Sequence, residues 1–506
     1  MTVPSVPYVL LQMVAVPLLF AVVVFALGGR MGKRVGWLAF VALLYTTILM
    51  VLVALDLWNG GSVTESYAWA PVSGLGFGFL ADDLSLPVAL VMNIVCTTTA
   101  VYSMDYMKHR LEAMYGTEKK GQYSLYFLNF MLLDAGLIGT ALSTNLIELY
   151  LFVELMLIPS AFMVALFGYT NRERTAIMYF LWNHLGAFIF FAGIILAYIG
   201  TGSFEISSLG SIHASTLAYW AAGLILLGWL IKMAVFGVHI WLPTAHAEHP
   251  TSFAPFIVTI VGVGNYVVVR LLVQYMPVEF SPLAFPLMVV AAATMVYGGA
   301  MTMVQNDVKY LYAWSTISQN AYSLLGIGSL SLLGVSGGIF YFLNHIIGKT
   351  ILFCVAGILI CQVGTRDMRK MGGLAGRMPI TATLCVIGSM ILSAVPPTGG
   401  FQAEWILFTG VFSTGVTGEP VWYIVVGVIG LLATLLTVAY TFWPVRRMFF
   451  GALPAELSQV REAPLTMTVP LVFLAGLSIV IGLYPDILFH FLYQYAKLLT
   501  LPFGAA

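Results

Sequence analysis

Long apolar runs recur along the whole chain and set its fold class before any motif is considered. Of its residues, 60% are hydrophobic and only 8% are charged, and the mean hydropathy is +0.96. A chain of that composition has too few polar residues to cover a water-soluble core. We therefore predict an integral, multi-pass membrane protein.

Fourteen such runs can be counted, each bounded by Gly, Pro, Asn or charged residues. The alternation of polar and apolar residues that is typical of a membrane barrel is absent, so helices are the way to satisfy the backbone in lipid. The predicted fold class is all-α, with about 14 transmembrane helices of roughly 20 residues or more. They cover residues 8–28, 35–57, 84–104, 124–142, 146–168, 175–200, 217–240, 251–276, 281–303, 309–329, 335–362, 378–413, 422–445 and 466–492.

Basic residues are concentrated in alternate loops, and this predicts the orientation. Odd-numbered loops carry Lys and Arg, whereas even-numbered loops carry acidic residues or no charge, and Lys497 in the tail departs from the rule. By the positive-inside rule both termini face away from the cytoplasm. The first run lacks the basic start and cleavage pattern of a signal peptide, so we expect a retained helix in the plasma membrane of a prokaryote.

Motifs for cofactor binding are missing from the sequence. The four cysteines lie in apolar runs without a CxxC pair or metal-ligand spacing, and no GxGxxG, Walker loop or HExxH occurs. The run from His246 to His249 is too short, and too near a helix end bounded by proline, to indicate a metal site. We expect no cofactor or metal in this chain and no nucleic-acid partner.

Charged residues inside the apolar runs indicate where the chemistry lies, since each costs ~2.5–3.5 kcal/mol at the membrane centre. Glu154, followed by Pro159, lies deep in the fifth run, and Lys232 lies in the seventh. A desolvated lysine can lose its proton near neutral pH, so both residues are candidates for proton transfer; a static ion pair is the alternative. His239, two turns beyond Lys232 on nearly the same face, is either a proton relay or a hydrogen-bonded structural residue.

The twelfth run is interrupted by two prolines and two glycines between residues 393 and 400, and Glu404 follows at once. Unwound backbone at membrane depth is tolerated where it lines a polar cavity. We predict broken helices in runs seven and twelve. His345 and Lys349, four residues apart on one face of run eleven, form a candidate relay between them; a stable hydrogen bond from His345 to a loop is the alternative.

Runs four to eight and nine to thirteen form two groups of five. Lys232 lies in the fourth helix of the first group and Glu404 in the fourth helix of the second. Because five is odd, the groups cross the membrane in opposite senses, as inverted repeats do. The predicted organisation is three N-terminal helices (1–123), a first inverted repeat (124–276), a second inverted repeat (281–449) and a C-terminal helix (450–506).

At these residues the chain resembles the antiporter-like subunits shared by respiratory complex I, membrane-bound hydrogenases and Mrp-type cation/proton antiporters. The resemblance covers roughly runs three to thirteen. It is carried by the stretch from Lys232 to Pro255, which includes His-x-Trp-Leu-Pro at His239 to Pro243, and by Glu154 to Pro159, His345 with Lys349, and Pro397 to Gly399 with Glu404.

The resemblance implies a proton path through the membrane centre, in which Glu154 and Lys232 are a coupled pair and His345 and Glu404 complete the route. A Glu in the twelfth run resembles the M-type subunit of complex I, whereas Lys349 after His345 resembles the hydrogenase and Mrp members.

One position departs from the family pattern. With Tyr266 and Arg270 as anchors, the eighth-helix lysine of the family corresponds to Gly262. The central bridge between the two halves would then depend on water, or on Asn265 and His345. Arg270 itself has no assigned role.

The resemblance implies a proton-translocating antiporter-like subunit of a multi-subunit respiratory-type complex, of the complex I or membrane-bound hydrogenase type, that couples redox energy to ion pumping. Redox chemistry would belong to partner chains. Expected partners are other membrane subunits and membrane lipid. The expected transported ion is the proton, and Na⁺ is an open alternative. The alternatives are a component of an Mrp-type Na⁺/H⁺ antiporter and a stand-alone solute carrier. The predicted proton-translocation residues are Glu154, Lys232, His239, His345, Lys349 and Glu404.

Overall fold

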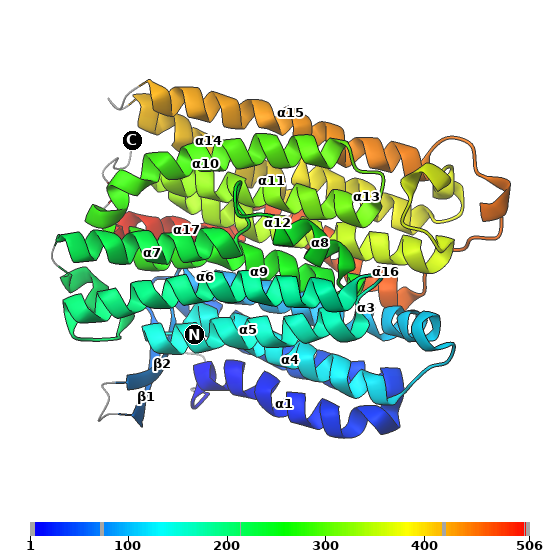
Figure 1. The fold of residues 1–506 in the computed structure, drawn as a ribbon, viewed down its shortest axis with the longest axis horizontal. Helices are drawn as coiled ribbons and strands as arrows, with labels where there is room; N and C mark the ends of the chain where they lie inside the picture. Colours follow the sequence, from blue (N-terminus) through cyan, green and yellow to red (C-terminus); the bar gives the residue numbers. More distant parts are fainter. Residues whose placement is uncertain (1–5, 71–74, 213, 417–420, 500, 502–506) are drawn as a thin grey trace.

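Long apolar helices packed side by side make up most of the computed structural model, which describes residues 6–70, 75–212, 214–416, 421–499 and 501 (Figure 1). Within these ranges, ten helical segments are long and apolar enough to cross a membrane, with α1 and α2 counted as one. The chain is thus a predominantly helical, multi-pass membrane protein, as predicted.

The helices follow the predicted runs closely at the start of the chain and in its middle. They are α1 (Val9–Met31), α2 (Gly36–Leu57), α3 (Ser85–Tyr115), α4 (Gly121–Leu142), α5 (Leu146–Phe167), α6 (Arg172–Thr201), α7 (Thr216–Lys232), α8 (Trp241–Glu248), α9 (Ala254–Val267), α10 (Pro277–Met303), α11 (Val308–Gly328), α12 (Leu332–Val363), α13 (Pro379–Leu392), α14 (Gly399–Val416), α15 (Trp422–Phe449), α16 (Leu465–Leu483) and α17 (Asp486–Leu498).

Two predicted runs, the twelfth and the last, are each divided between two helices. Run twelve is interrupted between α13 and α14, and in run seven α7 ends at Lys232, with α8 beginning just beyond the run at Trp241. Both of these breaks were expected. The last run, predicted as one helix over 466–492, ends instead at Leu483, and α17 begins after Pro485. Proline lacks the N–H that would continue the helix and clashes with the preceding turn, which explains this correction.

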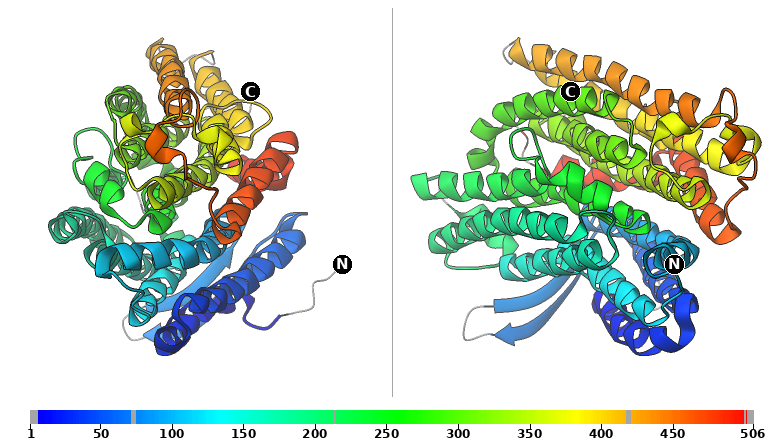
Figure 2. Two further views of the ribbon diagram at one scale, coloured as in Figure 1. Left: turned by 90° about the vertical axis from the view of Figure 1, so that its right-hand side faces the viewer. Right: turned by 45° about the vertical axis from the view of Figure 1, so that its right-hand side comes forward.

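A β-hairpin is the part of the fold that the all-α prediction missed. Strand β1 (Val63–Ala70) pairs antiparallel with β2 (Leu75–Ala81), and Figure 2 shows the hairpin projecting at one end of the helices. Glu65 of β1 accepts hydrogen bonds from the backbone N–H groups of Leu10, at 3.0 Å, and Leu11, at 2.8 Å. A carboxylate at the N-terminus of α1 satisfies its free donors, so the hairpin is fixed to the helices.

Loops rich in basic residues gather at the end opposite the hairpin. In Figure 1 the loop between α3 and α4 and the loop between α15 and α16 lie at the right, whereas the hairpin lies at the left. This grouping agrees with the alternation of basic loops along the sequence.

Arg270, which sequence analysis left unassigned, forms the most deeply buried ion pair of the described residues. Its guanidinium binds both oxygens of Asp82, at 2.8 and 2.6 Å, and also contacts Gln274 Oε1 at 2.9 Å. It lies in a π-helical turn, Val268–Val273, that continues α9. The carboxylate of Asp82 also accepts the N–H groups of Leu84 and Ser85 at the start of α3. The pair therefore joins α9 to α3 with its hydrogen bonds satisfied.

Removal of one partner from this pair should destabilise the protein strongly. In Arg270→Ala the carboxylate of Asp82 stays buried without its countercharge, a situation that typically costs about 3–5 kcal/mol. Thermal unfolding of the purified protein should show a large fall in stability. The control is Arg369→Ala, which breaks the exposed Arg369–Asp367 pair and should change stability little; an equal effect of both variants would contradict this account.

Asp83, beside Asp82, should make stability depend on pH. Burial and the charge of Asp82 raise the pKa of Asp83 to about 6, against a smaller opposing effect of His490. The folded pKa exceeds the ordinary value, so stabilisation from the protonated form is present at low pH and is lost as pH rises through about 6. Asp83→Asn should therefore gain more thermal stability relative to wild type at about pH 8 than at about pH 5.

Asp367 provides the control for this pH effect. Its hydrogen bonds with Arg369 lower its pKa to about 2, so its charge does not change across that range. The effect of Asp367→Asn should be the same at both pH values, and a pH-independent effect of Asp83→Asn would refute the assignment.

Candidate functional site

Glu154 lies on α5 and faces the neighbouring helix α6. Its Oε2 is 3.4 Å from His184 Nδ1, and its Oε1 has no hydrogen-bond partner among the described residues. The side chain of Glu154 is 16% exposed and that of His184 is 45% exposed. The carboxylate is therefore close to the lateral surface of the helices, with an imidazole between it and the outside.

Lys232 is the last residue of α7, at the point where the helix breaks. Its Nζ donates to the backbone oxygen of Asn183 at 3.3 Å and it is 1% exposed. At the break, Ile231 O accepts hydrogen bonds from the backbone N–H of Ala234 at 3.2 Å and from Trp241 Nε1 at 3.0 Å. The ammonium of Lys232 thus lies against a carbonyl of α6 rather than a carboxylate.

Two consecutive residues of α6 connect the predicted pair. Asn183 contacts Lys232, and His184 contacts Glu154, whereas no direct ion pair joins Glu154 to Lys232 in the described structure. The two charges still interact electrostatically. An ion pair between Glu154 and Lys232 is therefore not formed in this state, whereas Glu154 does lie against His184 of α6. The role of both residues in proton transfer stays a prediction.

His239 lies apart from this pair, in the segment between α7 and α8. Its ring packs against Phe236, Tyr297 and Trp314, with centroid distances of 6.1, 5.1 and 5.5 Å. Its Nδ1 has no hydrogen-bond partner in the described part of the chain. The aromatic setting gives His239 a packing role, and its role as a relay remains untested.

A second group of buried basic residues lies at the centre of the fold. His345 and Lys349 are on α12, and Lys349 Nζ donates to Tyr312 O at 3.0 Å and to the hydroxyl of Ser315. His246 of α8 packs on Phe353, 4.1 Å between centroids. Both ring nitrogens of His345 and of His246 lack a hydrogen-bond partner among the described residues, so neither imidazole is held by a structural hydrogen bond there.

Packing leaves little room for a side chain at Gly262, where the resemblance led us to expect a lysine. A Cβ at this position would overlap the ring of Phe342 on α12. Three residues further on, Asn265 Nδ2 donates to Asn320 Oδ1 at 2.9 Å, and Asn320 Nδ2 is 3.4 Å from Met233 O, directly after Lys232. An amide bridge between α9 and α11 thus occupies the place where the sequence suggested a gap.

A hydrogen-bonded cluster connects α11, α12 and α15. Tyr341 donates to Gln319 Oε1 at 2.7 Å, and Gln319 Nε2 donates to Tyr440 at 2.8 Å and to Thr437 at 3.2 Å. The hydroxyl of Tyr322 lies 2.8 Å from that of Thr437. These side chains, named here the Gln319 cluster, are all buried.

Glu404 lies on α14 next to the Gln319 cluster and close to the lateral surface. It interacts electrostatically with Tyr322, Tyr341 and Tyr440, and no hydrogen bond or ion pair of Glu404 is found in the described structure. It lines a cavity of 520 Å³ beside Trp405, which is 65% exposed. Glu404 is thus a carboxylate with one side toward buried hydroxyls and the other toward an opening.

Sequence reasoning missed several of these residues. Asn183, Gln319 and Asn320 are polar residues within apolar runs, and that signal alone could have marked them. Their partners come from other helices, so the role of each could not be read from the chain. No group of three metal-ligating side chains occurs among the described residues.

Two family models match the chain. The model for the membrane part of NADH:quinone oxidoreductase and Mrp antiporters covers residues 143–437, and the model for the N-terminus of chain 5 of NADH-ubiquinone oxidoreductase (complex I) covers residues 69–115. The first match contains Glu154, Lys232, His345 and Glu404.

Individual relatives agree with this match. A Na⁺/H⁺ antiporter subunit of Alkalihalophilus pseudofirmus is 31% identical over 495 residues, which are 92% of this chain and 60% of that protein. The M subunit of the NADH-quinone oxidoreductase of Rickettsia bellii is 28% identical over 386 residues, 74% of each chain. A chain of the Mrp complex of Dietzia sp. has the same fold, with a TM-score of 0.85 at 23% identity over 97% of this chain and 96% of that one. This protein therefore belongs to the family of antiporter-like membrane subunits that complex I and Mrp antiporters share.

Proposed function

We propose that this chain translocates protons as one subunit of a multi-subunit respiratory-type membrane complex. The observation that carries the proposal is the set of buried or half-buried ionisable side chains, named here the polar row, that α5, α7, α12 and α14 carry: Glu154, Lys232, His345, Lys349 and Glu404. Ionisable groups at this depth are costly and are retained where they serve ion movement. Redox chemistry, and any cofactor for it, belongs to partner subunits.

The first half of the path is the Glu154–Lys232 pair. In one state Glu154 lies with His184 and Lys232 lies with the Asn183 carbonyl. When the assembly brings the carboxylate to the lysine, the ammonium form is stabilised; when they separate, the ammonium loses that countercharge and the proton can move on. The second half begins at His345 and Lys349 and passes the Gln319 cluster to Glu404.

Polar groups that face outward at the two lateral ends of this row support the presence of partner subunits. His184 is 45% exposed at membrane depth, flanked by Leu181 and Leu185, which are 59% and 46% exposed. At the other end the cavity beside Glu404 opens next to Trp405. A polar group facing hydrocarbon is unfavourable, so both ends require a neighbouring protein surface.

The number of crossings and the orientation in the membrane are inferred from the apolar runs and from the positions of the basic residues. The chain crosses about 14 times in the plasma membrane of a prokaryote, with the basic loops in the cytoplasm and both termini outside. The inverted repeats are residues 124–276 and 281–449, and the breaks at α7–α8 and α13–α14 occupy matching places in them.

An Mrp-type Na⁺/H⁺ antiporter is the second candidate for the parent complex. It is favoured by the 31% identity to a component of such an antiporter. The two candidates differ in whether ion movement requires electron transfer, so activity of the purified native complex with and without an electron donor separates them.

Lys232 supplies the direct test of the proton-transfer role. Lys232→Ala should abolish proton uptake into membrane vesicles while the complex still assembles, because no group remains to accept the proton. Lys232→Arg should also fail, since a guanidinium keeps its proton throughout. Lys497→Ala, in the helix α17, is the control and should pump normally. Normal pumping by Lys232→Arg would mean that a fixed charge is sufficient and would overturn the proposal.

Gln319 tests the second half of the path. Gln319→Leu leaves the hydroxyl of Tyr341 without its partner, which costs about 1–3 kcal/mol for a buried group, and Tyr440 keeps only its hydrogen bond from Thr437. We expect lower thermal stability together with slower proton uptake. Gln305→Leu removes an amide that donates to the Met301 carbonyl at 2.9 Å and should change neither. Unchanged proton uptake in Gln319→Leu would remove the cluster from the path.

A further inference from the structure

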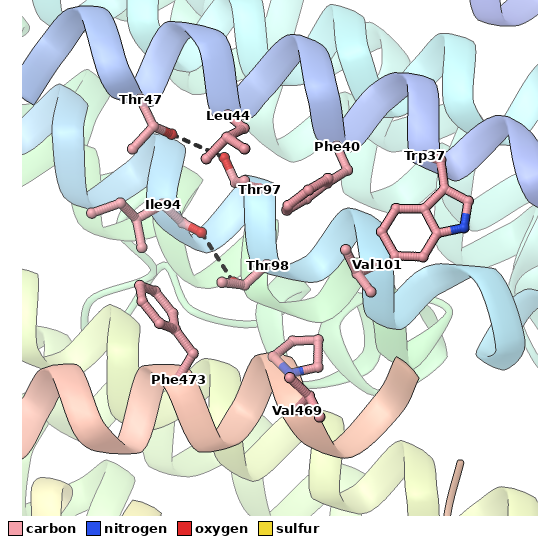
Figure 3. A pocket seen from close by; sticks show the side chains of 11 residues that line it. Trp37, Phe40, Leu44, Thr47, Ile94, Thr97, Thr98, Val101, Val469 and Phe473 are labelled. Atoms are coloured by element: carbon pink, nitrogen blue, oxygen red, sulfur yellow. Dashed lines mark hydrogen bonds between the residues drawn. The ribbon is translucent and has the colours of Figure 1, made fainter. Parts of the chain in front are cut away.

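An apolar groove lies on the outside of the helices, far from the polar row. It has a volume of 360 Å³ and runs between α2 and α16, with α3 as its floor. Figure 3 shows Trp37 and Phe40 of α2 facing Val469 and Phe473 of α16 across it. Trp37 and Phe473 are 47% and 53% exposed, so the groove is open to the surroundings of the protein.

The few polar atoms of the groove are already satisfied within the protein. Thr47 and Thr97 bond to each other at 3.2 Å (Figure 3), and Thr97 also donates to Asn93 O at 2.7 Å. Thr98 donates to Val95 O at 2.9 Å. The walls therefore offer methyl, methylene and aromatic surface to an occupant, which fits a hydrocarbon.

The length of the groove matches one leaflet of a bilayer. Trp37 and Thr47 line its two ends along α2 and are ten residues apart, which is about 15 Å at 1.5 Å per residue. The hydrocarbon core of a bilayer is about 30 Å thick, so the groove reaches from the interface to about the midplane. Tryptophan at its outer end is typical of the membrane–water boundary.

The outer end of the groove is basic. Lys33 Nζ is 2.5 Å from Asp105 Oδ1, and Thr466 at the start of α16 bonds the other oxygen, which closes the groove at this end. Arg34 lies one turn before Trp37 and, like Arg30, is exposed and has no ion pair within the described structure. Two free guanidinium groups at the membrane surface attract an anionic headgroup.

A single lipid chain matches the groove in its length, in its apolar walls and in the charge at its outer end. We propose that the groove holds an acyl chain of an anionic phospholipid, with its headgroup at Arg30 and Arg34 beside the Lys33–Asp105 pair.

The test is lipid retention by the full-length protein in nanodiscs of phosphatidylcholine mixed with phosphatidylglycerol, read by native mass spectrometry. Wild type should retain a phospholipid and prefer phosphatidylglycerol. Leu44→Trp, which fills the groove, should lose the retained lipid, whereas Leu435→Trp, on the exposed face of α15, should keep it. Arg34→Gln should keep the lipid but lose about fivefold of the preference for the anionic headgroup, and the exposed Lys370→Gln should not.

A second measurement covers the case in which Leu44→Trp misfolds. A photoreactive group placed at residue 44 of the protein in its native membrane should attach to phospholipid. Attachment to another protein chain, equal retention by Leu44→Trp and Leu435→Trp, or no preference for phosphatidylglycerol would each overturn the proposal. None of these outcomes depends on proton translocation, so the two proposals fail separately.

Discussion

The cost of a charge in a medium without water governs this structure, and the protein meets that cost in two different ways. Arg270 and Asp82 neutralise each other through two short hydrogen bonds, and Gln274 also accepts from the guanidinium. Lys232, by contrast, has a single carbonyl contact at 3.3 Å, and His345 has none among the described residues. The first arrangement fixes two helices together; the second leaves groups whose protonation can change at small structural cost.

Breaks in the helices provide this second setting. A continuous α7 would consume the carbonyls near its end, but the interruption after Lys232 exposes Ile231 O, which accepts a hydrogen bond from Trp241, and Met233 O, which lies near Asn320. The backbone thus supplies polar groups at a depth where side chains alone would be few. The same logic applies to the interruption before Glu404, where α14 begins at Gly399.

Much of the fold could be predicted from the sequence because the membrane makes one rule dominant. Runs of apolar residues gave helices at nearly the right bounds, and prolines and glycines marked the breaks. Prediction failed where the cause is not hydropathy: the β1–β2 hairpin is held by Glu65 at the start of α1, a contact between distant segments, and the division at Pro485 depends on a single residue. For the site, residue type identified Glu154, Lys232, His345 and Glu404 as candidates. It could not show that α6 separates Glu154 from Lys232. The contacts of these two residues with His184 and Asn183 join helices that are adjacent in space, so they cannot be read from the order of residues along the chain.

The contact between Gly262 and Phe342 constrains how this chain can change. Any side chain at 262 would meet the phenyl ring, so a lysine there cannot be acquired by one substitution while Phe342 keeps its place. A smaller residue at 342 alone would leave a cavity in a fully buried region. The two positions are therefore coupled: a side chain at 262 and the phenyl ring of Phe342 compete for the same space, so the effect of a change at one position depends on the residue at the other.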